Sequence, residues 1–232
     1  MAEQSLLDKV TALRESVREK TLSQPEVDSL AAGLAEAKNS FRPNDSEERF
    51  ALADGKGNAT GVSAPRWLCH LLGLSHLGAL CLLTWKNRGL GDCLILQVRS
   101  FTKLDFPGCV GFSVGGHVAA GESVEQALWR EAREEMGLKA EDFAAKPRSI
   151  GRVFDCNEVR EKNFFDSEWD ELYLTELTDE GVKNIRFEDA EVSALYFCRV
   201  DEAAALLQQK HVKLASNLVH LLPFYLKALC QG

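Results

Sequence analysis

Apolar residues recur at helical spacing near the start of the chain and at the closer spacing of strands further along. The first predicted helix carries apolar residues three or four apart, at Leu6, Val10, Leu13 and Val17. Pro25 begins a second predicted helix that runs to about Lys38. The segment 54–60, DGKGNAT, is rich in turn-forming residues and predicts a loop. We therefore expect residues 1–60 to form a helical N-terminal extension.

The sequence leaves three functions open for this extension: a lid, a homodimer surface, or a helical hairpin that covers one face of the main domain. Amphipathic helices most often simply pack, which favours the covering hairpin.

Residues 61–232 are expected to form the main domain. A polar turn, KNRGLGD, between two apolar runs indicates a hairpin. Strands are predicted at 77–85, 93–98, 109–114, 149–154, 171–177 and 194–200. Helices are predicted at 66–74, 124–136, 201–208 and 214–229. Helices interspersed with strands favour an α/β fold with a mixed sheet.

Length and charge restrict the function. The chain has 232 residues, 45% of them hydrophobic, which suffices for one catalytic domain with an extension. It carries 27 Lys and Arg against 35 Asp and Glu, a net charge of -8. This charge disfavours binding along a nucleic-acid backbone, so we expect a small-molecule substrate and no nucleic acid.

Cysteine usage and hydropathy suggest a cytoplasmic protein. The number of cysteines is odd, at 7, with no CxxC pair, and no secretory signal pattern opens the sequence. We therefore expect reduced thiols. The longest apolar run, 77–85, is far shorter than the ~20 residues that span a bilayer, so no membrane span is expected.

The segment 116–138, GHVAAGESVEQALWREAREEMGL, carries the candidate chemistry. Ser123 and Gln126 form a capping-box pattern, and Gly137 suits the position after a helix end, which predicts a helix over 124–136. Three glutamates then share an arc of about 100° on one face: Glu131, Glu134 and Glu135. Such charges repel one another unless a cation lies among them, and Mg²⁺, with Mn²⁺ as a substitute, suits carboxylate and phosphate oxygens. The alternative is a solvated acidic helix face.

This segment resembles the Nudix box, the diphosphate-cleaving motif of the Nudix hydrolases. The matching positions are Gly116, Glu122, Arg130, Glu131, Glu134, Glu135 and Gly137. The resemblance implies a Nudix-like α/β/α sandwich with a mixed sheet. It also implies that Glu131, Glu134 and Glu135 bind metal, and that Glu134 and Glu135 act in catalysis with Arg130 orienting them. Gly116 and Glu122 would belong to the substrate-binding part of the site, where Glu122 supports either the loop or a metal-bound water.

The stretches RSFTKLDFPG and SVGGHVAAGES resemble one branch of the superfamily, the type I isopentenyl diphosphate isomerases and the hydrolases similar to them. This resemblance implies that Arg99 and Lys103 contact the substrate diphosphate and that His76 and His117 bind metal. A further ligand histidine of that family falls on Cys69, with His70 beside it, so the ligand set is incomplete here. The alternatives are an ordinary packed histidine at position 76 and surface charges at positions 99 and 103.

An acidic residue after the box and the residue just before it also bear on the chemistry. A Nudix site commonly recruits an acidic residue after the box, and the candidates are Glu168, Asp170 and Glu171. The isomerase resemblance selects Glu171 as metal ligand and catalytic residue, with Glu168 as the rival. The catalytic cysteine of the isomerases corresponds to Gly115, which can neither donate nor accept a proton.

The sequence therefore predicts an Mg²⁺-dependent hydrolase that cleaves a diphosphate linkage in a small molecule. The substrate would be a nucleoside diphosphate linked to another moiety, or a related organic diphosphate. The alternatives are an isopentenyl-diphosphate isomerase-like enzyme, which needs the missing cysteine, and a non-catalytic sensor of diphosphate ligands.

Overall fold

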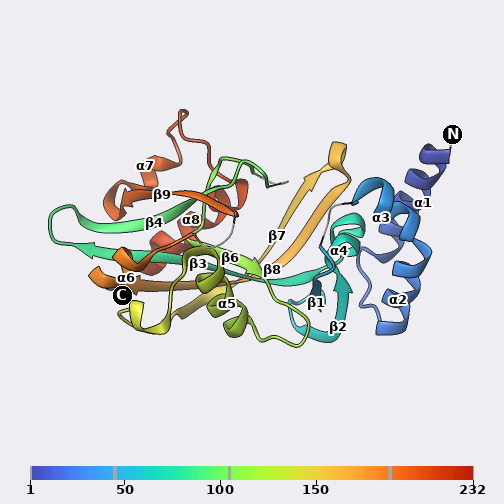
Figure 1. The fold of residues 1–232 in the computed structure, drawn as a ribbon, viewed down its shortest axis with the longest axis horizontal. Coiled ribbons are helices and arrows are strands. Elements are labelled where there is room, and N and C mark those ends of the chain that lie inside the picture. Colours follow the sequence, from blue (N-terminus) through green and yellow to red (C-terminus); the bar gives the residue numbers. More distant parts are fainter. Residues whose placement is uncertain (1, 44–45, 104–105, 188–189, 232) are drawn as a thin grey trace. The chain divides into compact units, whose positions relative to one another are not determined.

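The computed structural model describes residues 2–43, 46–103, 106–187 and 190–231 (Figure 1). The helices are α1 (Ala2–Val17), α2 (Gln24–Gly33), α3 (Ala35–Phe41), α4 (Arg66–Leu72), α5 (Val124–Met136), α6 (Asp179–Asn184), α7 (Ala203–Leu206) and α8 (Ser216–Leu229). The strands are β1 (Arg49–Ala53), β2 (Ala59–Pro65), β3 (His76–Asn87), β4 (Gly91–Arg99), β5 (Val110–Gly111), β6 (Val114–His117), β7 (Arg148–Val159), β8 (Phe164–Leu177) and β9 (Val192–Arg199). The expected α/β class with a mixed sheet is confirmed.

Contacts divide the chain into two compact units. The first unit comprises Met1–Gly78, His117–Val124 and Arg152–Asp170. The second comprises Ala79–Gly116, Glu125–Gly151 and Glu171–Gly232. The strands β3, β7 and β8 each contribute residues to both units. The boundary expected at residue 60 falls inside β2, and the division into an extension over 1–60 and a main domain over 61–232 stays a prediction.

In the first unit, the N-terminal helices build a core with the segment that follows them. Helix α1 contacts α3 and α4, and its apolar residues face that core as the spacing predicted. Val10 and Val17 are buried, while Leu6 and Leu13 pack against the cluster. This packing agrees with the covering hairpin; the lid and homodimer functions stay predictions.

The β1–β2 hairpin of the first unit was not expected from the sequence. Its strands pair antiparallel from Arg49↔Pro65 to Ala53↔Ala59. The turn is closed by Asp54, whose Oδ1 accepts hydrogen bonds from the backbone N–H groups of residues 56 and 58. The loop predicted at 54–60 is thus a hairpin turn. The strand sequences RFALA and ATGVSAP hold many small residues, which have weak strand preference.

Backbone pairing also fixes the segment that follows β6. The Val118 N–H donates to Leu77 O at 2.9 Å, and the Ala51 N–H donates to Val118 O at 2.8 Å. The segment therefore lies between β1 and the start of β3, where Leu52 pairs with His76. This arrangement brings His117 beside His76.

In the second unit, β4 is paired on both edges. It pairs antiparallel with β3 over residues 91–95, with β5 at Gln97 and Val98, and with β9 over residues 93–99. Tyr225 of α8 is fully buried and donates its hydroxyl hydrogen bond to Leu80 O at 2.8 Å. Trp129 of α5 meets Phe143 edge-on, with ring centroids 4.9 Å apart. These contacts hold α5 and α8 in the unit that carries the box glutamates.

Several predicted elements differ in extent. The strand expected at 109–114 is two short strands, β5 and β6, and the strand expected at 171–177 begins seven residues earlier, at Phe164. The helix predicted at 124–136 is confirmed as α5, and Gly137 has the left-handed φ of 66° expected after its end. Within the RSFTKLDFPG stretch, Leu104 and Asp105 lie outside the described residues.

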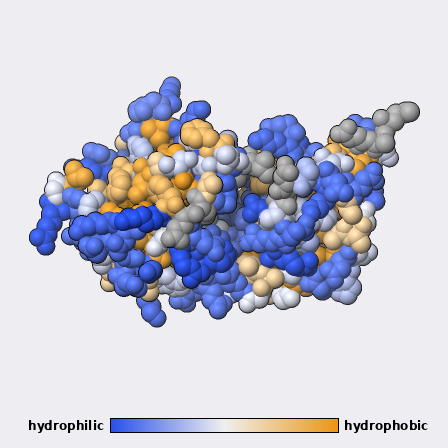
Figure 2. All heavy atoms as spheres, viewed as in Figure 1, coloured by the Kyte–Doolittle hydropathy of each residue, from blue (hydrophilic) through white to orange (hydrophobic). Residues whose placement is uncertain are grey.

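The surface is mostly hydrophilic in the view of Figure 2, with hydrophobic residues gathered over α8 and β9. The large exposed apolar side chains on these two elements are Phe197, Val219 and Phe224. Among the described residues, no helix combines the length and apolar character needed to cross a membrane.

Candidate functional site

Helix α5 brings the three box glutamates to one side, where a single arginine holds two of them. Arg130 Nη1 lies 2.6 Å from Glu131 Oε1 and 3.1 Å from Glu134 Oε2. The Glu131 side chain is 14% exposed, whereas that of Glu134 is 48% exposed. The arginine therefore pairs with the carboxylates of Glu131 and Glu134 at the same time.

Glu135 is the most deeply placed of the three glutamates. It is 2% exposed, and its two oxygens accept hydrogen bonds from the Gly115 backbone N–H at 3.1 Å and from Gln97 Nε2 at 3.3 Å. Burial raises the pKa of Glu135 to about 8, and the charge of Glu131 adds to the rise. Burial likewise raises the pKa of Glu131 to about 7, against the opposing effect of Arg130. Two desolvated carboxylates side by side fit a bound cation.

Gly116 leaves the space that Glu131 occupies. A Cβ atom at this position would lie 2.1 Å from Glu131 Oε1 and 2.2 Å from its Cδ. At Gly115, a Cβ atom would lie 2.7 Å from Leu80 Cδ2, so a cysteine there would require Leu80 to move. The two glycines thus fit a site built around carboxylates.

A further carboxylate, Glu191, lies in the second unit just before β9, and sequence reasoning missed it. Its charge raises the pKa values of both Glu131 and Glu135. Lys103 Nζ lies 2.5 Å from Glu191 Oε2, and the Ser100 N–H donates to Glu191 O at 2.8 Å. Glu191 therefore holds Lys103 and Ser100, and its charge acts on the carboxylates of α5.

Arg99 ends β4 at the base of the same loop. Its Cγ and Cδ atoms lie alongside Gly111 of β5, where a Cβ atom would be 3.6 Å away. The cations that the sequence assigned to substrate binding, Arg99 and Lys103, thus occupy the two ends of one short loop.

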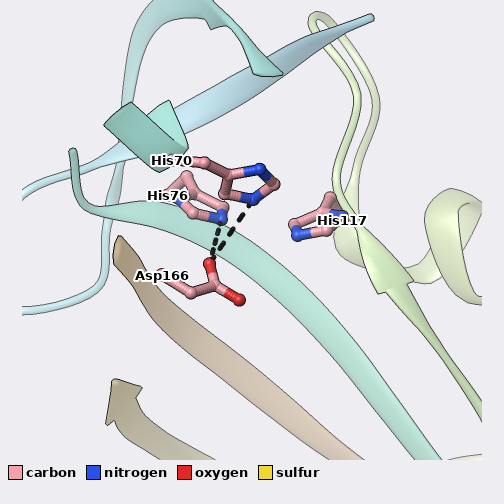
Figure 3. Close-up of side chains that lie close together, drawn as sticks. All are labelled: His70, His76, His117 and Asp166. Atoms are coloured by element: carbon pink, nitrogen blue, oxygen red, sulfur yellow. Dashed lines mark ion pairs between the residues drawn. The ribbon is translucent and has the colours of Figure 1, made fainter. Parts of the chain in front are cut away.

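The first unit contains a separate cluster of metal-ligating side chains, shown in Figure 3: His70, His76, His117 and Asp166. One ligand atom from each lies within 4.8 Å of every other. Asp166 Oδ1 lies 3.3 Å from His76 Nε2 and 3.6 Å from His70 Nε2. Helix α4 supplies His70, β3 supplies His76, the end of β6 supplies His117, and β8 supplies Asp166.

Glu168 extends this cluster along β8. Its Oε1 atom lies 3.1 Å from His117 Nε2 and 3.7 Å from His76 Nε2. Alternate residues of a strand share a face, so Asp166 and Glu168 point to the same side. Asp170 continues this row, and Gly78 gives it room, because a Cβ atom there would lie 2.2 Å from Asp170 Oδ1. Burial raises the pKa of Asp170 well above its usual value, with Asp166 and Asp155 adding to the rise.

A backbone carbonyl and a phenylalanine ring fix the orientation of the imidazole rings. His76 Nδ1 lies 2.7 Å from Leu74 O, and because a carbonyl only accepts, this nitrogen carries the proton and Nε2 keeps its lone pair. Phe50, which is fully buried, stacks on His117 at 3.9 Å and on His76 at 5.1 Å and meets His70 edge-on at 5.6 Å. Metal-binding histidines typically donate their second N–H to a carbonyl in this way.

The cluster also passes a test of donor chemistry. The His76 Nε2 and Asp166 Oδ1 atoms are buried without a hydrogen-bond partner among the described residues. Burial raises the pKa of Asp166, but its interactions with the nearby His76 and His70 bring this pKa below its usual value. An ionised carboxylate facing imidazole nitrogens suits a borderline transition metal better than Mg²⁺.

Two sequence expectations can be compared with this geometry. Cys69 is fully buried, as a core residue would be, and its thiol donates to Ala64 O at 3.9 Å, while the neighbouring His70 belongs to the cluster. Glu171 accepts a hydrogen bond from the Ser149 hydroxyl, and its role as metal ligand and catalytic residue stays a prediction. Glu168 is the carboxylate at His117.

Glu122 supports the loop before α5. Its Oε2 atom accepts the Ala119 N–H at 3.0 Å within the first unit. This contact fits the loop-supporting role suggested by the sequence.

Comparison with known proteins places this arrangement in a family. The sequence profile of the NUDIX domain matches residues 74–222, more than half of the chain. The chain belongs to the Nudix family. The likeness to the solved structure of DR0079 from Deinococcus radiodurans has a TM-score of 0.56 at 20% identity and covers 75% of this chain and 96% of that one. At this identity the likeness shows the Nudix fold alone.

Two curated proteins illustrate the relatives of this Nudix chain. Nudix hydrolase 3 of Arabidopsis thaliana is 28% identical over 165 residues, which are 71% of this chain and 21% of that protein. An isopentenyl-diphosphate Delta-isomerase of Salmonella arizonae is 31% identical over 117 residues, which are 50% of this chain and 62% of that protein. The chain spans less than two thirds of the length of either relative.

The raised pKa values predict how the metal-free protein responds to pH. The unfolded chain loses the protons of Glu131 and Glu135 near pH 4.5, but the folded protein holds them until about pH 7 and about pH 8. Ionisation therefore costs folding free energy across this window, and the Tm in EDTA should fall as pH rises from 4.5 to about 8. Differential scanning fluorimetry measures this slope.

Added Mg²⁺ should raise the Tm above its value in EDTA most strongly near pH 8, because the cation would bind the ionised carboxylates. The Glu135→Gln variant should show a shallower slope than wild type. Equal slopes in the two proteins would contradict the assignment of the buried protons.

Proposed function

We propose that this Nudix chain is a divalent-metal-dependent hydrolase that cleaves a diphosphate linkage in a small molecule. The observation that carries the proposal is the desolvated pair Glu131 and Glu135, held beside Glu134 by Arg130 and by backbone and amide donors. The substrate class is a nucleoside diphosphate joined to another group, or a related organic diphosphate.

The chain's residues divide the work at this site. Glu131, Glu134 and Glu135 would hold Mg²⁺, with Mn²⁺ as a substitute. When bound, the cation would neutralise phosphate charge and activate a water molecule for attack at phosphorus. Arg99 and Lys103 bind the diphosphate as charge-assisted donors.

Glu191 is the proton acceptor in this proposal, in addition to Glu171, whose role as metal ligand and catalytic residue stays a prediction from the sequence. Glu191 is a carboxylate outside the helix whose charge acts on Glu131 and Glu135, and Lys103 holds it in place at 2.5 Å. A base positioned by such a contact contributes to catalysis by removing the proton of the attacking water.

The histidine cluster would hold a second ion of a different kind. His70, His76, His117 and Asp166, with Glu168 at their edge, offer nitrogen-rich donors that favour Zn²⁺ or Fe²⁺. We infer that this ion ties α4, β3, β8 and the segment after β6 together in the first unit, and so stabilises the fold.

Substitution of the buried glutamate tests the hydrolase assignment. Glu135→Gln should keep the fold and lower kcat/KM by at least ~10², because the amide cannot bind the cation as a carboxylate does. Phosphate release from a panel of diphosphate compounds with Mg²⁺ is the measurement. Glu125→Gln, an exposed residue on the same helix, is the matched control and should keep wild-type activity. Equal activity of the two variants would contradict the proposal.

Metal content tests the histidine cluster independently of activity. Wild-type protein should retain about one transition-metal ion per chain after dialysis, and His117→Gln should weaken its binding by at least ~10-fold. Mass spectrometry of bound metals and Tm with and without Zn²⁺ are the readouts. His211→Gln changes an exposed histidine and should have no effect. Metal retained equally by both variants would rule the cluster out as the site.

The isomerase alternative makes a different prediction. Isomerisation of an allylic double bond needs a proton donor and an acceptor on the carbon skeleton, and the glycine at position 115 supplies neither. Incubation of isopentenyl diphosphate with the protein and Mg²⁺ should form no dimethylallyl diphosphate by proton NMR. Enzyme-dependent formation of that isomer, with no cleavage across the diphosphate panel, would overturn the hydrolase proposal.

A further inference from the structure

The first unit contains a cavity on the face of β8 opposite the histidine cluster. Its volume of about 410 Å³ falls within the roughly 300–1,000 Å³ of small-molecule sites. The C-terminal half of α1 forms one side, and β7 with β8 forms the other. Ser167 and Trp169 line it, and they alternate along β8 with Asp166 and Glu168 of the metal cluster.

One wall of the cavity is aromatic. Phe154 and Trp169 lie with ring centroids 5.3 Å apart at 52°, and Phe154 is 50% exposed. Trp169 packs on the backbone of Gly57, whose φ is 79°, and a Cβ atom there would lie 2.7 Å from the indole. The tryptophan is therefore backed by main chain, and the two rings form a fixed surface on which a planar ring can stack.

The opposite side carries cations that are already fixed in place. The Arg14 guanidinium lies 3.4 Å over the Phe165 ring and donates to Leu71 O at 3.1 Å and 3.2 Å. Burial lowers the pKa of Arg14, and the charge of Arg160 lowers it further, against Glu158 and Glu15. Two guanidinium groups close enough to affect each other favour an anion between or beside them.

The charges of the lining leave a small positive excess. Glu158 on β7 is paired with Arg160 at 2.5 Å. Glu15 and Glu19 also line the cavity, opposite in charge to Arg14. Arg18 and Lys20 add positive charge from the end of α1 and the residues after it. The Ser75 hydroxyl is buried and has no hydrogen-bond partner among the described residues. A ligand with acceptor oxygens would satisfy this donor.

We propose that this cavity is a second ligand site, which takes a planar aromatic anion of the size of a nucleoside monophosphate. The ring stacks on Trp169 with Phe154 at its edge, and the anionic group meets Arg14, Arg18 and the Ser75 hydroxyl. The site is distinct from the carboxylates of α5, because every lining residue belongs to the first unit.

An exposed cysteine gives a local readout for this site. Cys156 lines the cavity, and Cys230, at the end of α8, is exposed in the second unit and serves as an internal reference. The measurement is the rate of alkylation of each thiol by mass spectrometry, with adenosine 5′-monophosphate as the probe. No Mg²⁺ or Mn²⁺ is added and no chelator is present, so that the carboxylate site is not supplied with its cation, the histidine cluster keeps its ion, and the outcome does not depend on the hydrolase proposal.

The probe should slow alkylation of Cys156 about tenfold relative to Cys230 at ten times its Kd, because protection follows 1 + [L]/Kd. Adenosine and inorganic phosphate, tested separately, should protect less. Trp169→Leu and the surface substitution Arg18→Gln should each remove most of the protection. Phe224→Leu, a phenylalanine that is 54% exposed on α8, is the matched control and should leave it unchanged.

Three results would overturn the proposal. An unchanged ratio of the two alkylation rates up to about 10 mM probe, ten times a 1 mM Kd, would exclude the site. Protection that survives both Trp169→Leu and Arg18→Gln would place the ligand elsewhere. Equal protection by inorganic phosphate alone would exclude the aromatic part of the assignment.

Discussion

Glu131 and Glu135 are both withdrawn from water, which raises the pKa of each, and the charge of Glu131 raises the pKa of Glu135 further. Removing two carboxylates from water costs several kcal/mol for each ion unless opposite charge compensates, and one arginine with two neutral donors compensates only in part. The interior therefore either keeps protons on these residues or accepts a divalent cation. The raised pKa values, the space left by Gly116 and the cations of the neighbouring loop all follow from this constraint.

The histidine cluster meets the same constraint in another way. Its imidazoles can be buried neutral, so Phe50 can stack against the rings, and Asp166 supplies the negative charge. A site of this composition selects a softer ion than the carboxylates of α5 do. Each unit thus contains donors suited to one class of metal. The residues named in the histidine cluster all belong to the first unit, and the glutamates of α5 all belong to the second.

The sequence predicted the parts of the site that depend on spacing within one helix. Ser123, Gln126 and Gly137 marked the ends of α5, and the helical period placed the box glutamates together. It did not predict contacts set by strand pairing. Asp166 and Glu168 were missed as a pair because β8 was expected to begin at 171, and Glu191 precedes a strand without a local motif.

His70 was noticed but not selected, because the family alignment pointed one residue earlier. In a helix one residue corresponds to a rotation of about 100°, so the neighbour of an aligned position faces a different direction. Here the rotation turns Cys69 toward the carbonyl of Ala64 and leaves His70 with the other ligands. Strand β1, whose Phe50 packs against these histidines, and its partner β2 were hidden by their small residues and by the turn between them.

The central claim is that water attacks phosphorus at the carboxylate site. The most direct measurement uses a diphosphate compound that the enzyme cleaves. The compound is hydrolysed in ¹⁸O-labelled water with Mg²⁺, and the products are analysed by phosphorus NMR. The account predicts that one phosphate-bearing product carries the label at phosphorus and that Glu135→Gln abolishes this incorporation. Products without label, or label incorporated equally by the Glu135→Gln variant, would contradict it.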